Sequence, residues 1–181
     1  MEKPSHYTRT AIALHWLIAI AIVVTFGVGF YMHDLPLTPW KLKIFSWHKW
    51  AGVTIFLLVL FRLGWRITHR PPGPPVGMPA WQHIAAEAVH LLIYVLMFAI
   101  PLSGWLMSSA KGFQTVYFGV LPLPDLIGKD KELGELLSFV HKTLSIALAA
   151  IVLGHLGAAL KHHFIERNEV LTRMLPFIKK R

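Results

Sequence analysis

The sequence predicts an all-α membrane protein, a four-transmembrane-helix up-down bundle that forms a single domain over residues 1–181. The first observation is composition, because 55% of the 181 residues are hydrophobic and only 15% are charged. The second is the presence of four long apolar stretches, each close to the roughly 20 residues that cross a hydrocarbon core as a helix. The third is physical: in lipid the backbone polar groups must be paired within the segment, which favours helix.

The first two helices are expected at about 11–32 and 39–68. The first stretch is longer than the apolar core of a signal peptide, contains His15 and lacks a small-residue cleavage pattern, so we interpret it as a membrane span. In the second, Thr38 is a candidate N-cap and Pro39 suits the first helical position.

The second half of the chain begins with a Pro/Gly connector at 69–79, which cannot continue a helix. A third helix is expected at about 79–108 and a fourth at about 131–164. Between them, residues 110–130 are rich in Gly, Pro and aromatic residues and predict an outer loop with room for a short surface helix. Residues 168–181 are expected to form an amphipathic tail on the inner surface.

The chain contains no cysteine, and its net charge is +9. The lack of cysteine excludes disulfides, thiolate metal sites, iron–sulfur clusters and covalent haem attachment. With four spans, both termini share one side with the connector between the second and third helices, and most basic residues gather on this side. The positive-inside rule therefore predicts cytoplasmic termini and, for a bacterial chain, the inner membrane. Anionic lipid explains the basic residues better than nucleic acid does.

Five of the eleven histidines are expected within the spans. A buried ionisable side chain in lipid is costly and is by default a candidate for function. His141 and His155 are 14 residues apart (155 − 141) on the fourth helix, which places them on nearly one face. At 1.5 Å per residue they are separated by roughly 21 Å. The up-down topology puts His48 at the outer level with His141 and His15 at the inner level with His155. The fifth histidine of this group is His90.

Two facing imidazoles in a dry bundle fit a b-type haem, which offers one iron with two axial positions and a large apolar ring. Zinc is the competing interpretation, but a zinc site usually gathers three or four ligands at one point. Small residues such as Gly52 and Ala19 lie one turn from the histidines and leave room for a porphyrin edge, although they are equally typical of helix packing. The histidines therefore predict two non-covalent b-type haems, one at each level.

At this point the sequence resembles the bacterial cytochrome b561 family, in four stretches that cover essentially the whole chain in order. They are YTRTAIALHWL at 7–17, HKWAGV at 48–53, HLLIYVLMFAIPLSGW at 90–105, and HKTLSIALAAIVLGHLGAALKHHF at 141–164 followed by LTRMLP. The resemblance implies a dihaem electron carrier with ligands from helices one, two and four. It makes His15 and His155 the ligands of the inner haem, and His48 and His141 those of the outer haem. It also implies quinone chemistry, including oxidation of superoxide with reduction of ubiquinone.

Several further residues are candidates for supporting roles. His162 lies two turns after His155 and is a candidate proton carrier beside a quinone, with an interfacial histidine as the alternative. The three arginines near the inner level are candidate partners for haem propionates, with positive-inside bias as the alternative. These are Arg9, Arg62 and Arg66. For His90 a propionate or hydrogen-bonding role and simple packing both stay open.

With histidine in both axial positions the expected reaction is electron transfer at the haem edge. The leading hypothesis is a stand-alone oxidoreductase that passes electrons between a donor at the outer face and a quinone. A small anion such as superoxide is a candidate donor, attracted by outer lysines that are otherwise simply a solvated surface. The alternative is a haem-bearing membrane anchor subunit that relays electrons for a partner dehydrogenase. A metal transporter is a third hypothesis, which the pairing at two levels disfavours.

Overall fold

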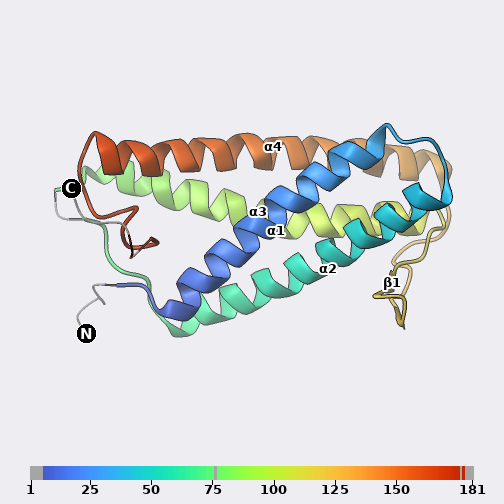
Figure 1. Ribbon diagram of the computed structural model, residues 1–181, viewed down its shortest axis with the longest axis horizontal. Coiled ribbons are helices and arrows are strands. Elements are labelled where there is room, and N and C mark those ends of the chain that lie inside the picture. Colours follow the sequence, from blue (N-terminus) through green and yellow to red (C-terminus); the bar gives the residue numbers. More distant parts are fainter. Residues whose placement is uncertain (1–5, 76, 176, 178–181) are drawn as a thin grey trace.

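A computed structural model describes residues 6–75, 77–175 and 177, and in these residues four long helices run antiparallel (Figure 1). Each is long and apolar enough to cross a membrane. The helices and a small hairpin are α1 (Arg9–His33), α2 (Pro39–Thr68), α3 (Ala80–Ala110), β1 (Val116–Tyr117), β2 (Leu121–Pro122) and α4 (Lys131–Phe164). The predicted four-helix membrane fold is therefore present, with helix ends within two residues of the expected positions.

Three of the helices begin at a side chain that caps the first turn. Thr8 Oγ1 accepts from the N–H three residues later at 3.2 Å, Thr38 Oγ1 does so at 3.3 Å, and Asp130 Oδ1 does so at 3.0 Å. These bonds satisfy N–H groups that have no partner inside the helix. Pro39 follows the Thr38 cap, where its missing N–H costs nothing.

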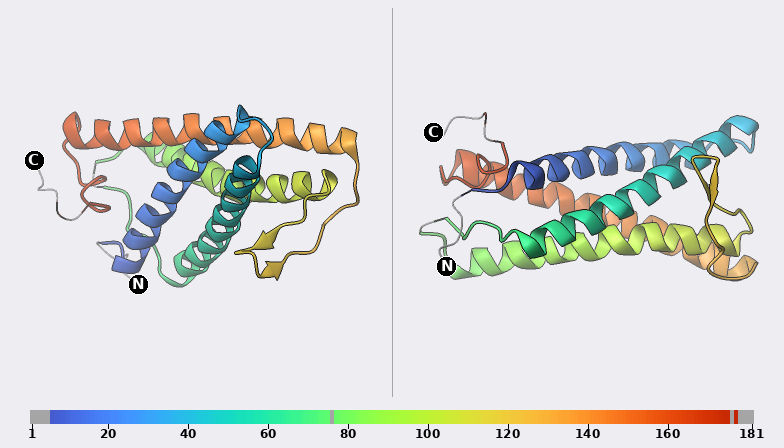
Figure 2. Two further views of the ribbon diagram at one scale, coloured as in Figure 1. Left: turned by 45° about the vertical axis from the view of Figure 1, so that its right-hand side comes forward. Right: turned by 90° about the horizontal axis from the view of Figure 1, so that it is seen from below.

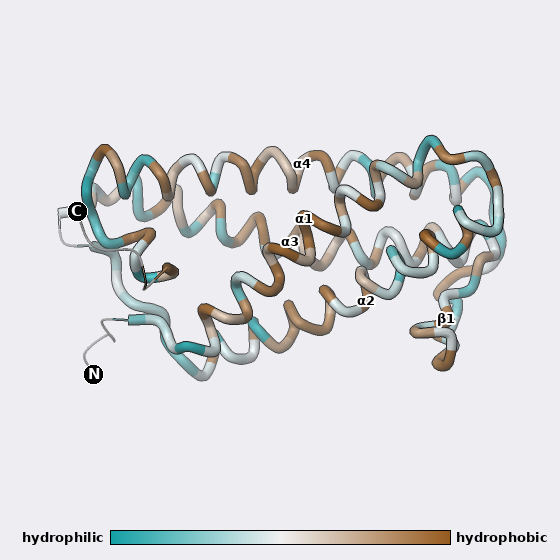
Figure 3. Tube along the Cα trace, in the orientation of Figure 1, coloured by the Kyte–Doolittle hydropathy of each residue, from teal (hydrophilic) through white to brown (hydrophobic). Residues whose placement is uncertain are grey.

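The helices pack in chain order, α1 on α2, α2 on α3, and α3 on α4 (Figure 2). Among the described residues, the backbones of α1 and α4 hardly approach each other. The main buried apolar cluster reflects this order. It consists of Ile18, Ile55, Val59 and Met97, all from α1, α2 and α3. Little of each span is buried inside the protein, and hydrophilic residues gather mostly near helix ends and connectors (Figure 3). The outward apolar surface is thus suited to lipid.

Helix α3 changes direction along its length (Figure 1), and it contains Pro101 in its second half. Proline lacks the N–H that would bond to the carbonyl of Met97, and its ring crowds that carbonyl, which is a common cause of a helix kink. Pro101 lies between the part of α3 that carries His90 and the part that carries Ser103 and Gly104. Both parts contribute to the site described below.

The connection between α3 and α4 contains a hairpin and not the short surface helix for which the sequence left room. Val116 pairs with Pro122 and Tyr117 with Leu121 in antiparallel register. The turn has positive φ at Phe118 (50°) and at Gly119 (74°). Two consecutive positive φ values match the twist of a tight hairpin and are incompatible with a helix.

The chain after α4 folds back under the bundle, at the end where α1 begins and α4 finishes (Figure 1). We call this the inner end, and the end with the β1–β2 hairpin the outer end. Within the expected amphipathic tail, residues 170–174 form turns, while 176 and 178–181 lie outside the described residues. Trp16 Nε1 donates to the Met174 carbonyl at 2.8 Å, and Arg173 Nη1 donates to the Gly73 carbonyl at 2.6 Å. These tertiary hydrogen bonds, and not amphipathic periodicity, determine the path of the segment.

Candidate cofactor-binding site

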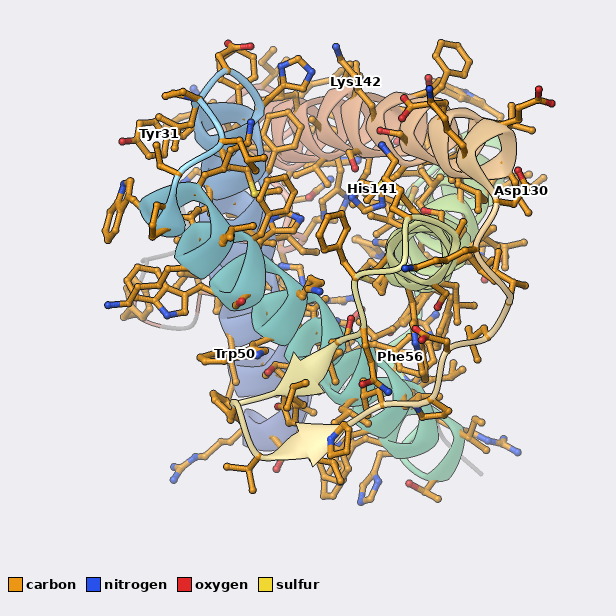
Figure 4. All side chains as sticks on the ribbon, turned by 90° about the vertical axis from the view of Figure 1, so that its right-hand side faces the viewer. Tyr31, Trp50, Phe56, Asp130, His141 and Lys142 are labelled. Atoms are coloured by element: carbon orange, nitrogen blue, oxygen red, sulfur yellow. The ribbon has the colours of Figure 1, made fainter. Side chains whose placement is uncertain are left out.

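Two pairs of facing imidazoles join α4 to the other half of the bundle. At the outer end, the rings of His48 on α2 and His141 on α4 have centroids 6.2 Å apart. At the inner end, the rings of His15 on α1 and His155 on α4 have centroids 6.4 Å apart. The ring planes cross at 76° and 66° respectively. These two histidine pairs are the ones that the up-down topology predicts. In the view from the outer end, His141 lies between α4 and α3 (Figure 4).

The separation within each pair is that of two imidazoles around one metal atom. Each metal–nitrogen bond is about 2.0 Å and the ring centre lies roughly 1 Å beyond, so two collinear ligands have ring centres about 6 Å apart. The observed 6.2 and 6.4 Å agree with this spacing. Within the part of the chain that the structure describes, no three His, Cys, Asp or Glu side chains converge as a zinc site would require.

The ring of His141 is oriented by the backbone of α3. Its Nδ1 lies 3.0 Å from the Ile100 carbonyl and 3.1 Å from Ser103 Oγ, which itself donates to the same carbonyl at 2.8 Å. A carbonyl only accepts, so Nδ1 carries the proton and the lone pair resides on Nε2. Metal-binding histidines commonly donate their second N–H to a carbonyl in this way.

Each outer histidine also packs against a glycine on a neighbouring helix. A Cβ added at Gly104 would lie 3.0 Å from Cε1 of His141, and one added at Gly29 would lie 3.0 Å from Cε1 of His48. The Thr25 backbone, one turn before Gly29, is within reach of His48, but His48 Nδ1 is buried without a well-formed hydrogen bond among the described residues. Glycine at both positions is what allows the two rings to approach the helix backbones.

The inner pair is accompanied by a partly buried arginine. Arg62 donates through Nη1 to the Ala11 carbonyl at 2.9 Å and through Nε to Tyr94 Oη at 3.1 Å, and its Nη2 is 3.5 Å from His15 Nδ1. The guanidinium of Arg66 lies 6.0 Å from the centroid of the same tyrosine ring. Arg62 and Arg66 therefore lie near the inner pair, whereas Arg9 is the exposed first residue of α1.

His90 on α3 belongs to the inner group. Its ring centroid is 5.2 Å from that of His155, so His155 contacts an imidazole on α3 as well as the one on α1. Arg62 and Arg66 are both close enough to act electrostatically on His90. Concentrated positive charge of this kind suits an anionic partner such as a carboxylate. The sequence predicts that His90 lies at the inner level, but it does not predict the contact between His90 and His155.

His162 lies at the inner end of α4 in a cluster of acid and base groups. Its Nδ1 is 2.6 Å from Glu166 Oε2, and Lys161 Nζ is 2.8 Å from Glu166 Oε1. The hydrogen bond from Lys161, followed by the charge of His162, lowers the pKa of the exposed Glu166 carboxyl below its usual value. The carboxylate partner is a feature that sequence reasoning missed, although the four-residue spacing from His162 to Glu166 is a visible signal.

The residues at both levels fit a b-type haem. The imidazole pairs have the spacing expected of two ligands to one iron, and His141 has its lone pair on Nε2, the nitrogen that would bind the iron. Helix α2 packs on α3, but α1 makes little direct contact with α4, so the facing imidazoles are the contacts described between α4 and the first two helices. A four-helix membrane bundle with imidazoles facing one another across helices is typical of the cytochrome b class of electron-transfer proteins.

The chain belongs to the prokaryotic cytochrome b561 family, whose family model matches residues 6–177. It is 33% identical to cytochrome b561 homolog 2 of Escherichia coli K12, over 96% of this chain and 93% of that protein. It is 28% identical to cytochrome b561 homolog 1 of the same organism, over 95% and 98% of the two chains. It is also 28% identical to the probable superoxide oxidase CybB of Yersinia pestis, over 97% of each chain. The protein is thus a multi-pass membrane electron-transfer protein of a haem b family.

Proposed function

We propose that the protein passes electrons across the bilayer through two b-type haems, the outer one held by His48 and His141 and the inner one by His15 and His155. The observation that supports this most strongly is the near-equal spacing of the two imidazole pairs, 6.2 and 6.4 Å, at two depths along α4. A bound haem supplies reversible one-electron chemistry at its iron. The same spacing in two places is hard to reconcile with incidental packing.

The protein's own groups hold and orient the ligands. The Ile100 carbonyl fixes the ring of His141 and increases its basicity as a ligand. With two histidines to hold each haem, a bound haem would supply electron transfer and would not bind a substrate at its iron. Arg62, with Arg66 and Arg9 as further candidates, offers guanidinium donors for the propionates of the inner haem.

Between the two levels the first three helices contribute an apolar cluster. The buried cluster of Ile18, Ile55, Val59 and Met97 lies on the three helices between the outer and inner histidines. The 14 residues from His141 to His155 correspond to roughly 21 Å along α4. An apolar core over this distance prevents protons and small ions from following the electron.

The proposal extends to the partners of the reaction. Ubiquinone is the proposed electron partner at the inner end, where His162 and its Glu166 neighbour carry a proton. Superoxide is the proposed donor at the outer end, supported by the similarity to a probable superoxide oxidase from Yersinia pestis. The excess of basic residues at the inner end supports a bacterial inner-membrane protein with cytoplasmic termini.

The test is haem quantitation with histidine variants. A dithionite-reduced minus oxidised spectrum, together with pyridine haemochrome analysis, is expected to show two low-spin b-type haems per chain. His48→Ala and His141→Ala are each expected to lose the outer haem and keep the inner one. His90→Ala is the control and is expected to keep both, because its ring does not face a partner at the ligand spacing. Two haems per chain in both outer variants would refute the ligand assignment.

Electron transfer to quinone is tested separately, with the wild-type protein in liposomes. Superoxide supplied outside is expected to reduce the haems, and added ubiquinone is expected to reoxidise them. His162→Gln is expected to slow reoxidation without changing haem content. Haems that superoxide does not reduce, but that a purified partner dehydrogenase does, would instead support the membrane-anchor alternative.

A further inference from the structure

The segment from Phe113 to Pro124, which we call the outer hairpin segment, is apolar and exposed. Its sequence, FQTVYFGVLPLP, has no charged residue, and charges resume only at Lys111 before it and Asp125 after it. Several of its large apolar side chains keep more than half of their surface exposed. They are Phe113 (60%), Phe118 (60%), Val120 (82%) and Leu121 (57%). An apolar surface of this kind on a loop marks an interaction site.

The hairpin turns back alongside α2 and does not project beyond the outer end of the bundle (Figures 1 and 2). Trp50 Nε1 donates to the Val116 carbonyl at 2.7 Å, and Thr54 Oγ1 is 2.9 Å from Tyr117 Oη. Trp50 is 11 residues and Thr54 is 15 residues after Pro39, which is about 16 and 22 Å along the helix. The view from the outer end shows Trp50 beside the hairpin (Figure 4). Both attachment points lie in the outer half of α2, one of the four helices long and apolar enough to cross a membrane.

The polar groups of the segment are largely satisfied within the protein. The ammonium of Lys49 donates to Ser108 Oγ at 3.2 Å and to the carbonyls of Phe113 at 3.1 Å and Gln114 at 3.3 Å. The Gln114 side chain in turn donates to the Leu123 carbonyl at 3.2 Å. Pairing of backbone groups inside the protein is the requirement that a non-helical segment meets when it enters a membrane. A loop exposed to water has no such requirement, because water forms hydrogen bonds with its backbone groups.

We propose that the outer hairpin segment is inserted into the outer leaflet of the bilayer, with Phe118, Val120 and Leu121 in contact with lipid. The hairpin surface continues the apolar surface of α2, where Leu57 is 51% exposed and Trp47, at the level expected for an interfacial aromatic belt, is 43% exposed. The occupant of this surface is therefore phospholipid, at the boundary between headgroups and acyl chains. This inference does not depend on the proposed reaction.

The experiment is site-directed spin labelling of the full-length chain in phospholipid nanodiscs. Because the chain has no cysteine, Val120→Cys and, in a second variant, Leu121→Cys each provide a single labelling site. Both side chains are exposed, so neither substitution disturbs a packed contact. Leu153→Cys, 69% exposed in the middle of α4, is the lipid reference. Lys131→Cys, exposed at the start of α4, is the aqueous reference.

Collision of the label with oxygen, which concentrates in lipid, is compared with collision with a water-soluble nickel complex. Because the proposal places the hairpin near the headgroups, the oxygen-to-nickel collision ratio at 120 and 121 is expected to be several-fold above that at Lys131 and below that at Leu153. A ratio like that at Lys131 would overturn the proposal and place the hairpin in water. Spin–spin broadening that disappears on dilution with unlabelled chain would also overturn it, because the surface would then be covered by a second copy.

Discussion

The glycine beside His48 provides a sharp test of how the outer pair is held. In Gly29→Ala the new Cβ would lie 3.0 Å from Cε1 and 3.5 Å from Nδ1 of His48. Carbon atoms in contact normally stay about 3.5–4.0 Å apart, so the ring must retreat by a few tenths of an ångström. Metal–ligand distances tolerate only about 0.2 Å. The substitution is therefore expected to weaken the outer haem and leave the inner haem unchanged.

Gly27→Ala is the matched control, because a Cβ at that position meets nothing within 4 Å and the residue lies on the same helix. Alanine in place of glycine in a helix interior usually stabilises by about 0.5–1 kcal/mol. Overpacking usually costs about 1–3 kcal/mol, so Gly29→Ala should lose up to about 2 kcal/mol net. Haem content, the low-spin spectrum and thermal unfolding measure the two effects. Equal haem content and equal stability in both variants would refute the reasoning.

Three other perturbations test how the inner end is assembled. Thr8→Val removes the α1 cap and the acceptor for Trp65 Nε1, which lies 2.9 Å from Thr8 Oγ1. The free energy of unfolding should fall by about 1–2 kcal/mol. An unchanged melting temperature would contradict the capping role. Trp16→Phe removes the 2.8 Å bond to the C-terminal segment, and limited proteolysis should then cut that segment faster than in the wild type. The hydrogen bond from Lys161 lowers the pKa of Glu166 below the ordinary carboxyl value of 4.5. The ion pair therefore stabilises the fold at pH values above 4.5, and this stabilisation is lost as the pH falls below 4.5. The melting temperature of Glu166→Gln should accordingly fall less below pH 4.5 than that of the wild type.

Much of the fold follows from local sequence features. Apolar length predicts the four spans, and residues such as Thr38 and Asp130 mark helix starts because their side chains pair with N–H groups that the helix leaves free. The pairing of histidines follows from helix geometry and alternating direction, since rise per residue converts sequence separation into depth. These predictions need no knowledge of tertiary packing.

Other features depend on tertiary contacts and were not predictable in the same way. The hairpin turn uses a positive φ at Phe118, a residue type that gives no turn signal. Nothing in the sequence distinguishes Gly29 and Gly104 from other small residues of the spans, and only the fold shows that each faces an imidazole. The approach of His90 to His155 depends on the relative rotation of α3 and α4, which periodicity alone does not specify.

The hydrogen bond from His141 to the Ile100 carbonyl has a consequence for the evolution of this site. The orienting atom belongs to the main chain, so any side chain at position 100 that keeps the helix path supplies it equally well. Alanine scanning at Ile100 would therefore report lost packing and not the loss of this hydrogen bond. An amide-to-ester replacement that weakens this carbonyl is the perturbation that would reveal its contribution. Part of the site is thus inherited through backbone shape and not through residue identity.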